Sequence, residues 1–265
     1  MKAICLCGGL GTRMLPATNC TNKHLLPVYT VQGAIPMLFY PIYTLVRSGI
    51  KEILIVSSRE HSGPIIEYLG DGERFDADFT YKIQDVSETK PLGIASALKL
   101  AEGFVQHERF AVILGDNFFS QEFAEEFKEF NENNSQETDK PMDAMVFLSQ
   151  VKDPHRFGVA YEENGKLYIE EKPTHPKSNM AVTGLYVYNH EVFTVAQTLN
   201  PSNRGELEIT DINNHFCNLG TISAKTITGF WSDMGVPQSM INTEDFIQEN
   251  NFQIDLPILK KKNKH

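Results

Sequence analysis

The sequence contains no long hydrophobic run, and this absence excludes one class of protein. No stretch approaches 18 consecutive apolar residues, and no charged and then apolar leader precedes a cleavage site. A membrane-spanning helix needs about 20 predominantly apolar residues, and a secretory signal has such a leader. We therefore expect a cytoplasmic protein with no membrane-bound part.

Positive charge is also scarce. Lys and Arg number 24 against 34 Asp and Glu, so the net charge is −10. Nucleic acid binding normally requires a basic surface, and we therefore expect no nucleic acid partner. A phosphorylated small molecule is not excluded, because it needs positive charge only at its own site.

Cysteine is limited to four residues in 265. Cys5 and Cys7 lie two apart in an apolar run and would face the same side of a strand. No matching pair of Cys or His accompanies them. We interpret them as reduced, buried thiols rather than as a metal site.

Two common phosphate-binding motifs are missing. The dinucleotide fingerprint GxGxxG would need glycine at position 14, where the chain has Met14. The Walker A pattern GxxxxGK[ST] is absent as well. The chain therefore belongs to neither of these nucleotide-binding classes.

A different glycine-rich turn follows the first apolar run, residues 3–7. It consists of Gly8, Gly9, Gly11, Thr12 and Arg13. Glycines allow sharp turns and a close approach of backbone N–H groups to phosphate oxygens, and Arg13 and Lys23 add fixed positive charge. A purely structural turn would also explain the glycines taken alone.

Strand-like and helix-like segments alternate through the first half of the chain. The predicted strands are 3–7, 52–57, 79–84, 110–114 and 144–150, and the predicted helices are 37–48, 64–69, 94–101 and 122–130. Such alternation predicts an α/β fold, a Rossmann-like, mostly parallel sheet flanked by helices. Ligands of such sheets bind at the carboxyl ends of the strands. The glycine-rich turn and Asp116, which follows 110–114, both fall there.

The second half has shorter strands, which predict a smaller β-rich lobe. The strands are 157–161, 167–171, 185–188 and 223–228, with Asn164-Gly165 as a hairpin signal. The helices are 191–199, 208–219 and 238–248. We expect one domain over residues 1–250, with a first part at about 1–150, a second part at about 151–230 and a tail at 251–265.

Two aspartates are candidate metal ligands. Asp116 lies in LGDN, directly after an apolar strand, and Asp233 lies in WSDMG. A carboxylate at either place can hold Mg²⁺ against nucleotide phosphates, or can cap the next turn. Sequence separation alone does not show that the two meet.

The glycine turn extends into the longer string GGxGTRxxPxTxxxxKxLLPV, over residues 8–28. This string resembles the signature of the sugar-1-phosphate nucleotidyltransferases, and the chain is most similar to short-form thymidylyltransferases of that family. The resemblance runs from residue 2 to about 248. It implies a nucleotide-binding part at about 1–150 and a sugar-binding part at about 151–230. It also implies transfer of a nucleotidyl group from dTTP or UTP to a sugar 1-phosphate, and glucose 1-phosphate is the sugar phosphate that we expect. The products would be a nucleotide sugar and pyrophosphate.

The resemblance also implies roles for individual residues. The expected catalytic residues are Arg13, Lys23, Asp116 and Lys172. The nucleotide would contact Gly8, Gly9, Gly11, Thr12, Arg13, Gln84, Gly93 and Asp116. The sugar phosphate would contact Asn117, Gly158, Glu171, Lys172, Val182 and Arg204. Mg²⁺ would be held by Asp116 and Asp233.

The chain departs from the family pattern near the nucleotide site. The segment VSETKPL between Gln84 and Gly93 is about four residues longer than the family pattern. Ser96 stands where the family often has glutamine. TVQGAI before Pro36 is a further insertion of about four residues, which we expect to lengthen a loop.

Two other functions remain open at this stage. A binding protein could keep the pocket without turnover, and a glycosyltransferase could share such a sheet. Intact Arg13, Lys23, Asp116, Lys172 and Asp233 argue against the first. A glycosyltransferase usually has two acids near one strand end, and LGDN has one. The family suggests a homo-oligomer, either a dimer or a tetramer.

Overall fold

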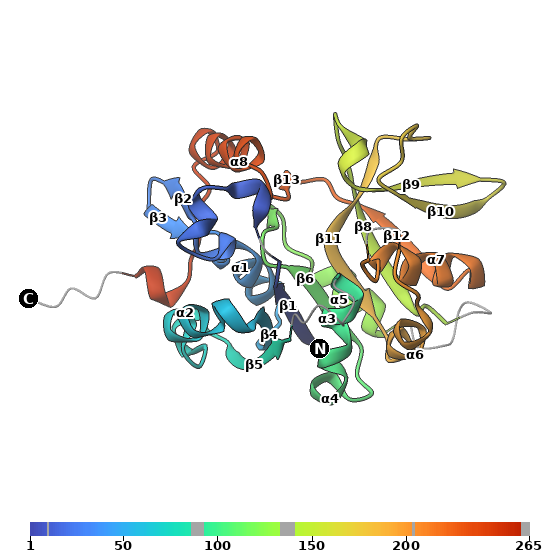
Figure 1. Cartoon of the computed structure of the whole chain (residues 1–265), viewed down its shortest axis with the longest axis horizontal. Helices are drawn as coiled ribbons and strands as arrows, with labels where there is room; N and C mark the ends of the chain where they lie inside the picture. Colours follow the sequence, from blue (N-terminus) through green and yellow to red (C-terminus); the bar gives the residue numbers. More distant parts are fainter. Residues whose placement is uncertain (10, 86–92, 133–140, 203–204, 261–265) are drawn as a thin grey trace, which may run out of the picture. The chain divides into compact units, whose positions relative to one another are not determined.

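The computed structural model describes residues 1–9, 11–85, 93–132, 141–202 and 205–260 (Figure 1). The chain divides into two compact units. The unit that we call the glycine-turn unit comprises residues 2–85, 113–124 and 229–265. The unit that we call the lobe unit comprises Met1 and residues 86–112 and 125–228.

Parallel strands form the centre of the glycine-turn unit. They are β1 (Lys2–Cys7), β4 (Glu52–Ser58) and β5 (Asp78–Gln84). Strand β1 pairs with β4, and β4 pairs with β5, both in parallel. Residues from Ala3 to Cys7 are buried, as expected for a strand that is covered on both faces.

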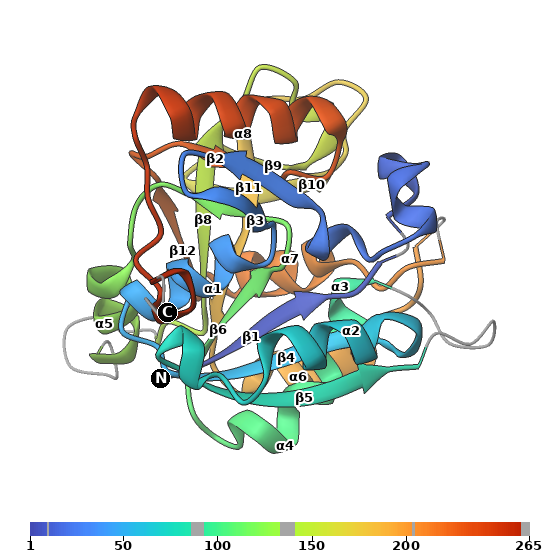
Figure 2. The ribbon, with the colours of Figure 1, turned by 90° about the vertical axis from the view of Figure 1, so that its left-hand side faces the viewer.

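Two helices cover these strands, α1 (Phe39–Arg47) and α2 (Arg59–Leu69). A third helix of the unit, α8 (Pro237–Glu249), packs against residues 27–30 and Trp231–Ser232. Figure 2 shows α2 lying along β4 and β5. Gly49, with φ of 88°, follows the end of α1, and a glycine with positive φ commonly ends a helix in this way.

The insertion before Met37 does not form the lengthened loop that we expected. It forms a hairpin of β2 (Pro27–Thr30) and β3 (Gly33–Pro36). The Thr30 hydroxyl accepts a hydrogen bond from Gln32 N at 3.0 Å and donates one to Gly33 O at 3.2 Å, which closes the turn. Pro36 therefore ends a strand, and α1 begins two residues later than the predicted helix over residues 37–48.

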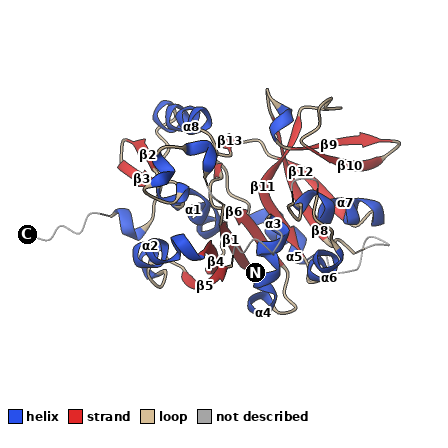
Figure 3. Ribbon diagram, in the orientation of Figure 1, coloured by secondary structure: helices blue, strands red, loops and turns tan. Residues whose placement is uncertain are grey.

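The lobe unit is built mainly from antiparallel strands. They are β8 (Ala144–Gln150), β9 (Gly158–Glu163), β10 (Lys166–Glu171) and β11 (Met180–Tyr188), with β12 (Ile222–Thr226) parallel to β8. Asn164 and Gly165 have φ of 53° and 72° in the β9–β10 turn (Figure 3). The predicted hairpin is thus confirmed.

The helices of the lobe unit are short. They are α3 (Ile94–Leu98), α4 (Glu102–Val105), α5 (Ala124–Glu132), α6 (Glu191–Thr198) and α7 (Ile209–Leu219). Strand β6 (Phe110–Leu114) is divided between the units, with its first three residues in the lobe unit and its last two in the glycine-turn unit.

The fold class is confirmed as α/β, with a mixed sheet flanked by helices. Parallel pairing is found among β1, β4 and β5, whereas β8–β11 pair antiparallel. The division at about residue 150 into nucleotide-binding and sugar-binding parts stays a prediction. Among the described residues, no helix is long and apolar enough to cross a membrane, and all four cysteines are free thiols.

Candidate active site

The glycine-rich turn leaves the carboxyl end of β1 and has backbone that favours glycine. Gly9 and Gly11 have φ of 102° and 64°, values that side chains rarely tolerate. A Cβ at Gly11 would lie 2.8 Å from Thr18 Cγ2, and the Thr18 hydroxyl donates a hydrogen bond to Gly11 O at 2.9 Å. The turn is therefore closed on itself, and Thr12 and Arg13 follow in a short 3₁₀ helix (Thr12–Met14).

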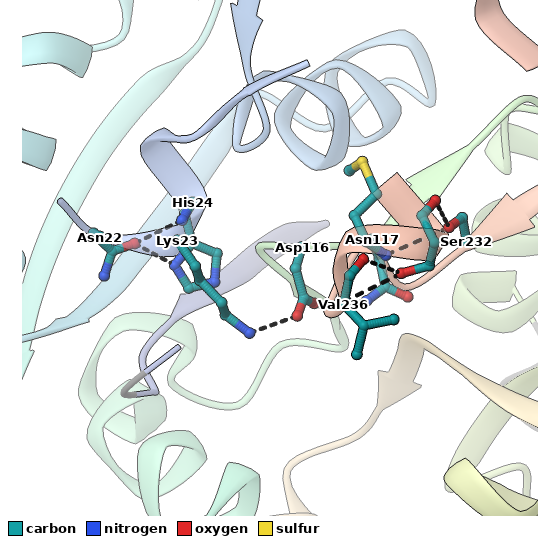
Figure 4. A network of polar contacts seen from close by, with 9 residues as sticks. Asn22, Lys23, His24, Asp116, Asn117, Ser232 and Val236 are labelled. Carbon is teal, nitrogen blue, oxygen red and sulfur yellow. Dashed lines mark hydrogen bonds and ion pairs between the residues drawn. The ribbon is translucent and has the colours of Figure 1, made fainter. Parts of the chain in front are cut away.

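Lys23 reaches the end of β6. Its Nζ lies 2.6 Å from Asp116 Oδ2, as Figure 4 shows. The Lys23 and Asp116 side chains are 14% and 10% exposed, so water screens this ion pair less than it would at the surface. The sequence places these two residues 93 positions apart, and the fold brings them together.

Asp116 is held as a carboxylate. Burial is the largest single effect and raises the pKa of its carboxyl, but the charge of Lys23, the electrostatic effect of His24 and the hydrogen bonds from Lys23 and Asn117 together outweigh it. The pKa of Asp116 consequently lies below its ordinary value. The side chain can therefore supply negative oxygen ligands at neutral pH.

A hydrogen-bond chain links Asp116 to the WSDMG segment. Trp231 Nε1 donates to Asn117 Oδ1 at 2.7 Å, and Asn117 Nδ2 donates to Asp116 Oδ1 at 2.9 Å. Both Asn117 and Trp231 are buried. These bonds fix the orientation of the Asp116 carboxylate from the side opposite Lys23.

Two short strands bring Asp233 to the same place. Strand β13 (Trp231–Ser232) pairs antiparallel with β7 (Phe118–Phe119), with Ser232 opposite Phe118. Asp233 therefore follows the pair at the position where Asn117 precedes it. The backbone alone places the carboxylates of Asp116 and Asp233 at one end of this small ladder.

Arg13 lies against the same segment. A Cβ at Gly235 would lie 3.0 Å from Arg13 Nη2 and 3.2 Å from Asp233 Oδ2. Only glycine leaves room there for both groups. Arg13, Lys23, Asp116 and Asp233 are thus neighbours within the glycine-turn unit.

Gln84, the residue predicted to recognise the base, ends β5 beside the glycine turn. Its Oε1 would lie 3.1 Å from a Cβ placed on Gly8. The side-chain amide of Gln84 and the glycine-rich turn therefore lie at the same edge of the parallel strands. The following segment, residues 86–92, lies outside the described residues.

Of the residues predicted to contact the sugar phosphate, Gly158, Glu171, Lys172 and Val182 lie in the lobe unit, whereas Asn117 lies in the glycine-turn unit. Glu171 Oε2 accepts a hydrogen bond from the Thr210 hydroxyl at 2.6 Å. A Cβ at Gly158 would lie 3.3 Å from Thr210 Oγ1 and 3.5 Å from Glu171 Oε2. Gly158 thus leaves the space beside this polar pair to another group.

Lys172 has an unusual backbone conformation. Its φ is 45°, which is uncommon for a residue with a long side chain. Its N–H donates to Phe157 O at 2.9 Å, and its Nζ lies 3.3 Å from Glu171 Oε1. The Lys172 side chain is 41% exposed, so its ammonium group remains accessible to an anion.

The remaining predicted residues have simpler surroundings. Val182 is buried on β11. Gly93 has φ of 110°, and a Cβ there would lie 2.5 Å from Leu207 O, so the start of α3 requires glycine. Arg204 lies outside the described residues.

Sequence reasoning did not single out Asn22, His24, Thr210 or Trp231. Asn22 and His24 lie within the signature string, and Trp231 lies in WSDMG. Their positions in these motifs were the available signal. The hydrogen bonds of Thr210 with Glu171 and of Trp231 with Asn117 join distant segments, which the sequence does not display. The bonds between Asn22 and His24 are local, but the packing of His24 on Gly115 is not.

Comparisons with known proteins identify the family of the chain. The family model described as nucleotidyl transferase matches residues 2–250. Glucose-1-phosphate thymidylyltransferase of Neisseria gonorrhoeae is 40% identical over 253 residues, which cover 94% of this chain and 83% of the relative. The enzyme of the same name from Mycobacterium tuberculosis H37Rv is 33% identical, with 94% and 82% covered.

Solved structures give the same result. The crystal structure of a candidate glucose-1-phosphate thymidylyltransferase from Bacillus anthracis, in complex with sucrose, is 43% identical with a TM-score of 0.84. It covers 96% of this chain and 97% of its own. A UDP-glucose pyrophosphorylase complexed with UDP-glucose has a TM-score of 0.76 at 22% identity, with 94% and 98% covered, and supports the fold alone. The chain therefore belongs to the nucleotidyl transferase family, as its signature string predicted.

Proposed function

We propose that this protein transfers a nucleotidyl group from dTTP or UTP to glucose 1-phosphate. The observation that carries this proposal is the contact of Lys23 with a buried, ionised Asp116 beside the glycine-rich turn. Curated relatives of 33–40% identity are glucose-1-phosphate thymidylyltransferases, which supports the substrate pair.

The reaction needs no covalent enzyme intermediate. A phosphate oxygen of the sugar 1-phosphate attacks the α-phosphorus of the nucleoside triphosphate. The new O–P bond forms as the bond between the α-phosphorus and the bridging oxygen breaks, and pyrophosphate leaves with the electron pair. Catalysis then consists of alignment and neutralisation of negative charge. In this scheme Arg13 and Lys23 act on the triphosphate, and Lys172 acts on the sugar phosphate.

Asp116 and Asp233 would hold Mg²⁺. The described residues contain no cluster of three or more His, Cys, Asp or Glu that could enclose a metal ion. Two carboxylates suit Mg²⁺, which usually takes one or two carboxylates plus substrate phosphates and water. Bound there, Mg²⁺ would supply charge neutralisation at the phosphates. Asn117 and Trp231 would keep the Asp116 carboxylate oriented for it.

The sugar side rests on the lobe unit. Glu171 would accept hydrogen bonds from sugar hydroxyls, in the space beside Gly158. Lys172 would pair with the phosphate, and Asn117, Val182 and Arg204 would complete the contacts. The Glu171–Thr210 hydrogen bond of 2.6 Å supports a fixed orientation for the carboxylate.

Gln84 would bind the base of the nucleotide. The residues whose backbones would approach the nucleotide are Gly8, Gly9, Gly11, Thr12 and Gly93. An amide has both a donor and an acceptor, which matches the imide edge that thymine and uracil share. A homo-oligomer, either a dimer or a tetramer, and the cytoplasmic compartment remain predictions.

The test is pyrophosphate release across a grid of triphosphates and sugar 1-phosphates. We expect release with dTTP or UTP and glucose 1-phosphate in the presence of Mg²⁺. If CTP or ATP is the better donor, the base assignment is wrong. If no pair releases pyrophosphate, the proposed activity is wrong.

A further inference from the structure

Two buried side chains beside Lys23 form a local hydrogen-bond unit. Asn22 Oδ1 lies 2.8 Å from His24 N and 2.6 Å from His24 Nδ1. Asn22 and His24 are only 3% and 1% exposed. Figure 4 shows both His24 contacts converging on the single Asn22 oxygen.

These contacts determine the tautomer of His24. The backbone N–H of His24 is always a donor, so the Asn22 atom that it meets must be the amide oxygen. That oxygen only accepts hydrogen bonds, so His24 Nδ1 must carry its proton. The ring is therefore in the Nδ1–H form, with its Nε2 free of a proton.

His24 also fixes the distance between its own turn and the end of β6. A Cβ at Gly115 would lie 2.8 Å from His24 Cδ2, so the imidazole packs directly on that glycine. Gly115 N donates to Leu6 O at 2.9 Å, which fixes the glycine in turn. Hence consecutive residues of one segment meet consecutive residues of the other, with His24 on Gly115 and Lys23 on Asp116.

The ring is held neutral. Burial lowers the pKa of His24, and the adjacent charge of Lys23 lowers it further, to about 3. The other charged or titratable groups that act on it are Asp116 and His61. A neutral ring adds no positive charge that would repel Lys23 from Asp116.

We propose that His24, oriented by Asn22, is a positioning residue that sets the Lys23 ammonium group against the Asp116 carboxylate. The inference rests on the proposed function for its effect on turnover. His24 itself does not contact substrate in this scheme. Loss of its Nδ1–H donor would leave the turn tied to Asn22 by the backbone N–H of residue 24 alone, and Lys23 would shift.

Substitutions at His24 separate the hydrogen bond from the packing. His24→Phe keeps a ring but has no donor, whereas His24→Asn has a donor amide near the place of Nδ1. Cys7→Ala is the matched packing control, because Cys7 Sγ lies against the same Gly115 at 3.0 Å from its Cβ position. We expect His24→Phe to lower kcat roughly 10- to 100-fold, as a displacement of about 1 Å does. The KM for glucose 1-phosphate should change little.

His24→Asn should restore a large part of kcat, and Cys7→Ala should lower the melting temperature while largely keeping kcat. Equal kcat in His24→Phe and wild type would overturn the proposal, as would a loss in Cys7→Ala as large as that in His24→Phe. Loss of kcat in His24→Asn equal to that in His24→Phe would overturn the role of the donor.

A second measurement does not depend on turnover or on any variant. Long-range ¹H–¹⁵N NMR of the wild-type histidine rings reports the tautomer directly. We expect His24 to be neutral and protonated at Nδ1 at pH 7. A ring protonated at Nε2, or a charged ring, would overturn the positioning unit even if the enzyme is active. Absence of turnover in the wild type would instead refute the proposed function.

Discussion

Acidification should destabilise this protein through His24. The pKa of His24 is lowered from 6.5 to about 3 by burial and by Lys23. The unfolded chain therefore binds a proton in a pH range where the folded protein does not. Stability is fully present above the unfolded pKa and is lost as the pH falls from about 6.5 toward 3.

The size of the loss follows from the shift. Each pH unit between the two pKa values changes the free energy of unfolding by about 1.4 kcal/mol. Between pH 7.5 and pH 5 the contribution is about 2 kcal/mol. For a chain of this size, this difference corresponds to a change in melting temperature of roughly 4 to 8 °C.

The assay compares thermal unfolding of wild type and His24→Asn from pH 7.5 to pH 5. Every other group titrates in both proteins, so the difference between their pH slopes isolates His24. The wild type should lose about 2 kcal/mol more than the variant over this range. Parallel pH slopes would refute the buried, neutral histidine, whatever the absolute stability of the variant.

Three further predictions concern activity. Lys172→Ala should raise the KM for glucose 1-phosphate and lower kcat with little change in nucleotide affinity, because Lys172 belongs to the lobe unit. The control is Lys177→Ala, which changes an exposed lysine that pairs with Glu163. Equal losses of affinity for both substrates in Lys172→Ala would refute the assignment of Lys172 to the sugar phosphate. Gln84→Ala should weaken discrimination of dTTP and UTP against CTP by about 1–3 kcal/mol, measured as the ratio of the kcat/KM value for dTTP or UTP to that for CTP. An unchanged ratio would refute the proposed contact of Gln84 with the base. Asp116→Asn and Asp233→Asn should each lower kcat strongly, and the double variant should be little worse than either, because the effects of residues that act as a unit are not additive. Removal of Mg²⁺ by EDTA should abolish turnover of the wild type. Full activity in either single variant would refute a shared metal ion.

Much of the fold was predictable because apolar runs mark the buried strands. Residues 3–7, 52–57 and 110–114 correspond to β1, β4 and β6 almost residue for residue. Their burial requires continuous apolar sequence, so the pattern and the structure agree. The Asn164-Gly165 turn was equally clear, because it needs two positive φ values.

Short elements were not predictable in the same way. The two-residue strands β7 and β13 have no periodicity to detect, and they form only because Phe118 and Ser232 meet. The β2–β3 hairpin was also missed. Its turn lacks a common turn dipeptide at Val31-Gln32, and Gln32 is held by Ile254, more than 200 residues away.

The candidate site also has residues that were predictable from the sequence and residues that were not. Lys23 and Asp116 were predicted from motifs, and the structure brings them to 2.6 Å. The roles of Trp231 and His24 required knowledge of which atoms face them. Their partners, Asn117 and Gly115, come from the end of β6, a contact that no local pattern in the sequence specifies.

The measurement that tests the central proposal most directly follows the α-phosphorus. The enzyme is supplied with dTTP labelled at the α-phosphate, glucose 1-phosphate and Mg²⁺, and the products are separated. We predict that the label appears in the nucleotide sugar, with one pyrophosphate released for each label transferred. No label should remain on the protein when glucose 1-phosphate is omitted. Label found on the protein, in inorganic phosphate or only in unreacted dTTP would contradict direct nucleotidyl transfer.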